Sequence, residues 1–159
     1  MEKNKPLELA LDLLKHSNMV CNNEYRFVTP DFGIVISFAN MESHLFRLGQ
    51  PYRLEEGRII RGLRGKTRII INLIEYTVYP QTIVTFIPGS IVELLEFTPD
   101  YDFQMIAVDK DFLPLLRRDQ LFESHVRQNL VTRVTDTEWK LSDAYFTLIL
   151  RNCLQTIVP

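Results

Sequence analysis

The segment from residue 25 to residue 108 most constrains what this 159-residue chain can fold into. It consists of short runs rich in Ile, Val, Tyr, Phe and Thr, separated by turn residues such as Gly65 and Pro88-Gly89. Because no helical period separates these runs, they predict the strands of a β-sandwich, jelly roll or barrel. The predicted strands span residues 25–29, 33–38, 44–48, 58–64, 67–72, 74–79, 83–87, 91–97 and 103–108.

Helical patterns flank this β-rich segment. Residues 6–16 predict a short N-terminal helix, since Pro6 suits a first helical turn and leucines recur on one face. After an N-cap at Asp109, a helix is expected over about 110–129, although Pro114 falls within it. Thr135 and Glu138 form a capping box that opens a last helix. We therefore expect a β-barrel unit with its N-terminal helix over residues 1–108 and a helical segment over 109–159.

The last helix carries two apolar stripes, and one helix face cannot bury both. One stripe is expected to pack on the barrel, and the other is expected to face a second copy of the chain in a homodimer. Alternatively, the preceding helix covers both stripes. The first stripe is Leu141, Tyr145 and Leu148, and the expected dimer stripe is Phe146, Leu150, Cys153, Leu154 and Ile157.

The composition favours a soluble cytoplasmic protein. The net charge is −2, without the basic surplus that phosphate contacts usually need, so direct nucleic-acid binding is not expected. The two cysteines are far apart in sequence, which favours a reducing compartment. The N-terminal residues are too polar for a secretory signal, and no apolar run reaches the roughly 20 residues that span a membrane.

The residues that usually carry catalysis are scattered. His16, His44 and His125 are isolated from one another, so no metal site is expected. There is no nucleophile motif and no glycine-rich phosphate loop, and the paired acidic residues fall in expected turns or helix starts. We expect no catalytic residue, no metal and no cofactor.

Basic residues cluster between residues 58 and 68. Strand alternation places Arg58 and Arg64 on one face of their strand and Arg61 on the other. An arginine inside a small barrel needs a carboxylate or an anionic or polyhydroxy ligand to meet it. The alternative is that these arginines fringe the barrel or decorate its outer face.

The run PYRLEEGRIIRGLRGKTRIIINLIEYTVYPQTIVTFIPGSIVELLEF, followed by FQMIAVDKDFL, resembles the cupin-type sensory domain at the N-terminus of AraC-type transcription regulators. The matching features are a tight hairpin at Gly65, a second at Asn72-Leu73, the Pro88-Gly89 turn and a final strand that leads into a helix. The resemblance covers about residues 32–116. It implies a mainly β fold, a cupin-like double-stranded β-helix (a jelly-roll barrel) with a C-terminal pair of helices.

The resemblance also implies a function. Such a domain binds a small effector, a sugar or another polar metabolite, inside the barrel and dimerises through its C-terminal helices. A DNA-binding domain with two helix-turn-helix motifs is expected to follow in the same polypeptide, and it is not in this chain. We expect DNA contact only through that domain.

The resemblance departs from metal-binding cupins, because Arg58 stands where a glutamate ligand would be and Val92 replaces a late histidine. A metal-dependent enzyme is therefore not expected. The corresponding inward positions predict a pocket lined by Arg58, Ile60, Ser90, Val92 and Leu94, with Tyr52 and Arg53 near its mouth. Two alternatives stay open: a metal-independent sugar isomerase or epimerase, and a stand-alone binding protein whose barrel is packed with side chains.

Overall fold

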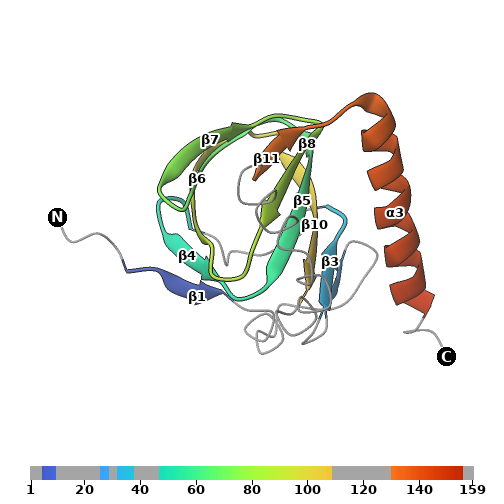
Figure 1. The fold of residues 1–159 in the computed structure, drawn as a ribbon, viewed down its shortest axis with the longest axis horizontal. Coiled ribbons are helices and arrows are strands. Elements are labelled where there is room, and N and C mark those ends of the chain that lie inside the picture. The colour runs from blue at the N-terminus through green and yellow to red at the C-terminus, as the bar shows by residue number, and fades with distance from the viewer. Residues whose placement is uncertain (1–4, 10–25, 29–31, 38–46, 109–129, 156–159) are drawn as a thin grey trace, which may run out of the picture.

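A computed structural model of the protein describes residues 5–9, 26–28, 32–37, 47–108 and 130–155. Its strands form a five-stranded sheet and a six-stranded sheet that face each other, with one described helix outside them (Figure 1). The elements are β1 (Leu7–Leu9), β2 (Arg26–Val28), β3 (Phe32–Val35), β4 (Pro51–Leu54), β5 (Gly57–Arg64), β6 (Thr67–Ile71), β7 (Ile74–Val78), β8 (Thr82–Phe86), β9 (Ile91–Phe97), β10 (Asp102–Val108), β11 (Val131–Arg133) and α3 (Asp136–Gln155).

The strand pairing is that of a jelly roll. β3 pairs with β10, β4 with β9, β5 with β8 and β6 with β7, all antiparallel. These nested pairs arise when one long hairpin is rolled up, so that the chain crosses between the sheets at most of its turns. The orders β4-β9-β6-β7 and β8-β5-β10-β3 follow within the two sheets. The expected double-stranded β-helix has this pairing.

Most of the predicted strands within the described residues are confirmed to within a residue or two, because their alternation matches their burial. Two turns were also identified correctly: Gly65 has a φ of 65°, and Asn72 and Leu73 have φ values of 48° and 73°. Positive φ at both central residues is typical of the tight hairpin turns that suit the twist of paired strands. The predicted strand over 44–48 is not formed at Arg47 and Leu48, and its first residues lie outside the described part.

The predicted N-terminal helix is wrong where the structure describes it. Leu7–Leu9 is the strand β1, which pairs in parallel with β4 at the sheet edge. The edge strand β4 has backbone N–H and C=O groups without a partner strand. A strand at Leu7–Leu9 can bond to these groups, whereas a helix at the same residues could not. Residues 10–16 of the expected helix lie outside the described residues. The sequence also missed β4, since Gly49 and Pro51 indicate a turn.

The C-terminal segment differs from the expected helical pair. Val131–Arg133 forms β11, which adds to the six-stranded sheet beside β8. The helix expected over 110–129 lies outside the described residues. The capping box is confirmed: the Thr135 amide donates to Glu138 Oε2 at 2.9 Å, and the Glu138 amide donates to Thr135 Oγ1 at 3.3 Å.

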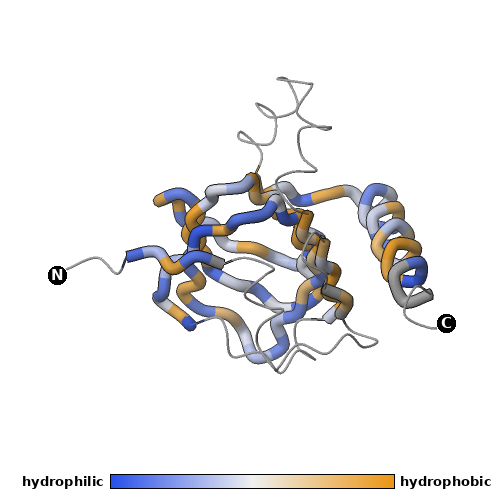
Figure 2. Tube along the Cα trace, turned by 90° about the horizontal axis from the view of Figure 1, so that it is seen from below, coloured by the Kyte–Doolittle hydropathy of each residue, from blue (hydrophilic) through white to orange (hydrophobic). Residues whose placement is uncertain are grey.

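Two apolar layers hold the fold together. One lies between the sheets and includes Ile71, Val84 and Phe86. The other lies outside the six-stranded sheet, where Phe146 of α3 packs on Ile34 and Ile106. Figure 2 shows the strands as a ring with α3 beside it. The helix therefore closes the outer face of one sheet, while the space inside the barrel is left to side chains from both sheets.

The expected docking face of α3 is wrong. Phe146 is buried against the barrel and Leu150 is half-buried in the same cluster, so these two expected dimer residues pack toward the barrel. The side chains of Cys153 and Leu154, and the whole of Ile157, lie outside the described residues. The stripe expected on the barrel is the exposed one, with Leu141, Tyr145 and Leu148 all more than half exposed. Both stripes have apolar periodicity, so only the docking angle of α3 decides between them.

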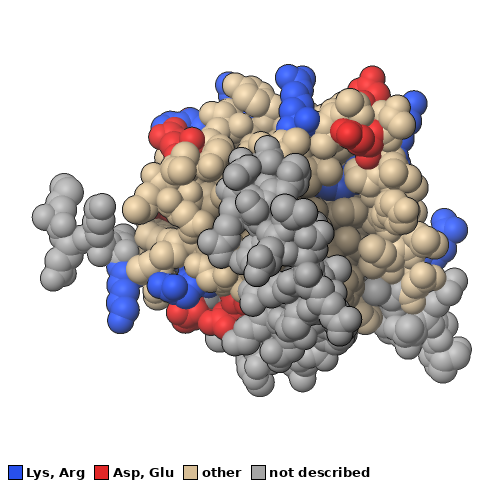
Figure 3. All heavy atoms as spheres, viewed as in Figure 1, with Lys and Arg blue, Asp and Glu red and all other residues tan. Residues whose placement is uncertain are grey.

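Charged side chains are dispersed over the surface. On the face drawn in Figure 3, Lys and Arg alternate with Asp and Glu among neutral residues, as the net charge of −2 suggests. In the part of the chain that the structure describes, no helix is both long and apolar enough to cross a lipid bilayer.

Candidate ligand-binding cavity

A cavity of about 50 Å³ lies inside the barrel, between the two sheets. A single water needs roughly 10–15 Å³ of such space, and an engineered cavity of roughly 150 Å³ holds benzene. The cavity therefore has room for a few waters or for a molecule of only a few atoms. Its walls are Tyr52, Leu54, Arg58, Ile60, Ile69, Phe86, Val92, Leu94, Tyr101, Phe103 and Met105.

The structure brings most of the predicted pocket residues together. Tyr52, Arg58, Ile60, Val92 and Leu94 all line the cavity, although they come from three different strands. β4 and β9 are neighbours in the five-stranded sheet, and β5 lies in the six-stranded sheet. The jelly-roll pairing turns each of these side chains inward, toward the space between the sheets.

Two predicted residues lie elsewhere. Arg53 points outward from β4, where its Nε lies 3.5 Å from Glu8 Oε1 on β1. Strand alternation explains this placement, since its neighbour Tyr52 points inward. Ser90 is buried, but its hydroxyl donates to the Ile87 carbonyl at 2.6 Å and closes the turn before β9 instead of lining the cavity.

Six lining residues were missed by sequence reasoning. Alternation from Tyr52 could have identified Leu54, and the inward register of β6 could have identified Ile69. Met105 lies opposite Ile60 across the β5–β10 pair, a register that is visible only once the strands are paired. The others are Phe86, Tyr101 and Phe103.

Arg58 is the charged side chain on the cavity wall, and it is 3% exposed. Its Nη2 lies 3.1 Å from Glu56 Oε2, and its Nη1 lies 3.6 Å from the sulfur of Met105. Its buried Nε has no hydrogen-bond partner among the residues that the structure describes. Burial lowers the pKa of Arg58, and the charge and hydrogen bond of Glu56 oppose this effect. Arginine is not deprotonated in proteins, so the group stays a cation, and its Nε is a donor that no described residue meets.

The other polar groups of the cavity are phenols. Tyr52 Oη accepts a hydrogen bond from the Arg47 amide at 2.9 Å. Burial, followed by the charge of Asp102, raises the pKa of Tyr101, so this phenol stays protonated at neutral pH. The Tyr101 hydroxyl is therefore not poised as a base, because a protonated phenol is a hydrogen-bond donor and a weak acceptor.

The described cavity wall offers no side chain suited to acid-base catalysis at neutral pH. None of its lining residues is His, Asp or Glu. Within the ranges that the structure describes, no cluster of three His, Cys, Asp or Glu side chains is placed to hold a metal ion. The geometry suits binding through apolar contact and one arginine donor.

A second hollow, of about 350 Å³, lies on the outer side of β6 and β9. Its cation Arg68 is already paired with Glu75 at 2.7 Å and with Glu96 at 3.1 Å. Arg68 and its two partners are about half exposed, and none of the lining residues has a buried polar atom that, like Arg58 Nε, lacks a hydrogen-bond partner among the described residues.

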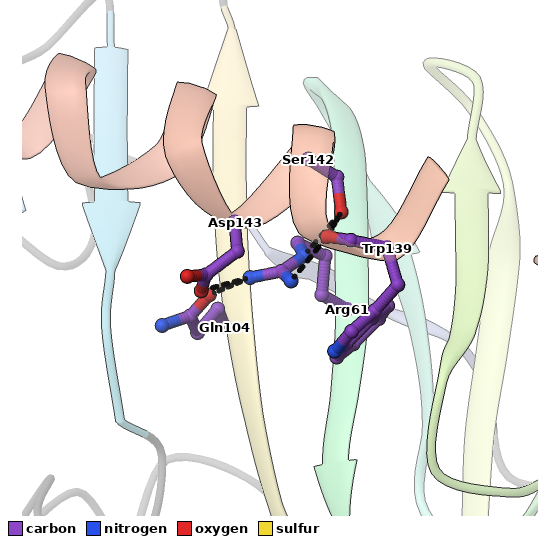
Figure 4. A network of polar contacts seen from close by, with 5 residues as sticks. All are labelled: Arg61, Gln104, Trp139, Ser142 and Asp143. Carbon is purple, nitrogen blue, oxygen red and sulfur yellow. Dashed lines mark hydrogen bonds and ion pairs between the residues drawn. The ribbon is translucent and has the colours of Figure 1, made fainter. Parts of the chain in front are cut away.

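Arg61, on the opposite face of β5, joins the barrel to the helix (Figure 4). It is fully buried, and its Nε donates to Ser142 Oγ at 2.9 Å while its Nη2 donates to the Trp139 carbonyl at 3.2 Å. The remaining partners are the side chains of Gln104 on β10 and Asp143 on α3.

The Arg61 guanidinium also lies 4.0 Å from the centre of the Trp139 ring, a cation–π contact. The sequence placed Arg61 on the outer face but did not predict its burial beneath a helix. Arg64 and Arg68, in contrast, fringe the barrel, as the alternative interpretation held.

No protein-family model matches the sequence, and no curated protein matches it. Several solved structures are similar at low identity, including the following three. The EutQ protein of Clostridium difficile is 16% identical with a TM-score of 0.35, over 52% of this chain and 60% of that one. KdgF from Halomonas sp. is 13% identical with a TM-score of 0.40, over 62% and 94%. The plu4264 protein of Photorhabdus luminescens is 16% identical with a TM-score of 0.34, over 64% and 99%. The nested strand pairing identifies the fold as a jelly roll without them.

Proposed function

We propose that this chain is a small-molecule-sensing domain that binds its effector in the barrel, at Arg58. The observation that carries this proposal is the Nε of Arg58, a buried donor that belongs to a cavity-lining residue and has no partner among the described residues. Leaving a buried donor unsatisfied costs about 1–3 kcal/mol, and more for a charged group. Such groups are retained where a ligand or an ordered water completes them.

The connection to α3 supports a sensing role. β5 carries Arg58 on its inner face and Arg61 on its outer face, and Arg61 contacts Trp139, Ser142 and Asp143 in the first turns of α3. A ligand that moves Arg58 acts on the same short strand that holds the helix. Ligand binding would shift the balance between two positions of α3 in proportion to its differential affinity for them.

The broader role that we propose is that of the sensory domain of an AraC-type transcription regulator. The resemblance of residues 32–116 to such domains supports it, and so does a jelly roll followed by a long helix. In this proposal, a DNA-binding domain with two helix-turn-helix motifs follows Pro159 in the polypeptide. Reading the gene beyond the Pro159 codon tests this part directly, and a stop codon there would contradict it.

The proposal includes a homodimer through the exposed stripe Leu141, Tyr145 and Leu148. Glu138 and Arg151 are exposed at opposite ends of this stripe. An antiparallel pair of α3 helices, crossing between residues 144 and 145, would set Leu141 against Leu148 of the second copy. The same arrangement would bring each Glu138 near an Arg151, so the stripe complements itself in both shape and charge.

Ligand binding is tested by screening small polar metabolites for a rise in the melting temperature of the wild-type chain. Val92→Phe fills the cavity and should abolish the rise. Ile74→Phe, at a side chain that is 58% exposed, adds a ring away from the cavity and should keep it. If Ile74→Phe loses the response as fully as Val92→Phe, the cavity is not the site.

The second candidate is a barrel with a structural role only. The cavity volume of about 50 Å³ favours it, because a hexose does not fit without movement of the walls. A screen without any bound ligand would support this alternative. The metal-independent enzyme has less support, because the described cavity wall contains no His, Asp or Glu to act as a general base.

A further inference from the structure

The arginine on the cavity wall forms a buried ion pair with Glu56. Arg58 is 3% exposed and Glu56 is 5% exposed, and they form an ion pair at 3.1 Å. Two buried charges of opposite sign stabilise each other in surroundings of low dielectric constant. The buried side-chain atom of this pair that lacks any hydrogen-bond partner among the described residues is a donor, the Nε of Arg58.

A second anion bound at Arg58 would lie close to the negative charge of Glu56. Its attraction to Arg58 would be offset by repulsion from Glu56, which is bound to the neighbouring nitrogen of the same guanidinium. The anion would also lose its hydration on entering an apolar cavity. An uncharged acceptor avoids both costs and still satisfies the vacant donor.

We infer that the cavity selects a small uncharged molecule with a carbonyl-type acceptor at one end and an apolar body, and that Glu56 excludes carboxylates. This inference rests on the proposed function and specifies its ligand class. The acceptor meets Arg58 Nε, and the apolar body lies among Ile60, Val92, Leu94 and Phe103. The volume of about 50 Å³ limits the part enclosed in the barrel to a few non-hydrogen atoms.

The test compares two probes of equal size. Butanone and propionate have the same number of non-hydrogen atoms, but butanone is a neutral acceptor and propionate is an anion. Each is titrated into the full chain with labelled methyl groups, and the shifts of Ile60, Val92 and Leu94 report binding in the cavity. Molecules this small bind weakly, so dissociation constants of millimolar order are expected.

Glu56→Gln supplies the decisive variant, since it keeps the shape of the side chain and removes its charge. In the wild type, propionate should bind at least roughly tenfold more weakly than butanone, and in Glu56→Gln this preference should disappear or reverse. Glu8→Gln, on the exposed Arg53 pair, removes a charge of the same sign outside the barrel and should leave the preference unchanged.

The possible results separate the two proposals. Equal or tighter binding of propionate to the wild type would overturn the ligand class while leaving the cavity as a binding site. An unchanged preference in Glu56→Gln would overturn the role of Glu56. If neither probe shifts the cavity methyl groups at saturating concentration, both this inference and the proposed function fail.

Discussion

Arg58 and Arg61 lie three residues apart on β5, and they are buried on opposite faces of the same strand. Arg58 faces the cavity and pairs with Glu56, whereas Arg61 faces α3 and binds Ser142 and the Trp139 carbonyl. Two neighbouring residues of β10 repeat this arrangement, because Met105 contacts Arg58 and Gln104 contacts Arg61. The two paired strands therefore connect the inside of the barrel to the helix.

Arg61→Met should loosen α3 from the barrel. The change removes several hydrogen bonds and the cation–π contact, so the free energy of unfolding should fall by about 2–4 kcal/mol. Urea titration followed by the fluorescence of Trp139, the single tryptophan, and by circular dichroism measures this. Asp143→Asn is the matched control, because the Asp143 side chain is 60% exposed and should contribute at most about 1 kcal/mol. Similar losses for both variants would contradict the anchoring role of Arg61.

Glu56→Ala should be strongly destabilising, because it leaves Arg58 as an uncompensated buried charge. The expected loss is about 3–5 kcal/mol in chemical denaturation. The double variant with Arg58→Met removes both charges and should lose less than the sum of the single changes. Additive losses would show that the two side chains do not form a coupled pair.

Gly65→Ala should destabilise the chain more than Gly89→Ala does. Both glycines have positive φ, 65° and 87°, so either substitution carries a backbone cost of roughly 1–2 kcal/mol. A Cβ at Gly65 would also lie 2.8 Å from the Cα of Tyr101, whereas a Cβ at Gly89 meets nothing within 4 Å. The difference between the melting temperatures of the two variants measures the cost of the close contact at Gly65. Equal melting temperatures would show that this contact costs nothing.

Stability at alkaline pH should depend on Tyr101. Burial raises its pKa in the folded state above the unfolded value of about 10, so the folded chain keeps a proton that the unfolded chain loses. This group's contribution is fully present below pH ~10 and falls by about 1.4 kcal/mol per pH unit above it. Tyr101→Phe should flatten the pH dependence of unfolding relative to the wild type, and Tyr145→Phe, at an exposed ring, should not.

The oligomeric state should respond to charge on the exposed stripe of α3. Leu148→Glu should give a folded monomer in sedimentation, since Leu148 is 54% exposed and not needed by the barrel core. Ile149→Glu, one residue along, places a charge in the cluster beneath the helix and should unfold the chain instead. A wild-type chain that stays monomeric at high concentration would rule out the proposed dimer.

The sequence by itself determined the features that depend on local chemistry. The hairpins at Gly65 and at Asn72-Leu73 follow from the backbone conformations that those residues tolerate, and the start of α3 follows from its capping box. Alternation along the strand predicted that Arg58 and Arg61 lie on opposite faces, and the resemblance to cupin-type domains predicted that Arg58 points inward. These inferences succeed because φ preferences and side-chain period act over a few neighbouring residues.

Only the tertiary structure decided which distant groups meet. The edge of β4 turned Leu7–Leu9 into a strand, and the docking of α3 buried Phe146 while leaving Tyr145 exposed. Glu56 became the partner of Arg58, and Trp139 that of Arg61, through packing across the barrel wall. Such contacts depend on the relative placement of whole elements, and the many weak apolar contacts that set this placement have no signature in any short stretch of sequence.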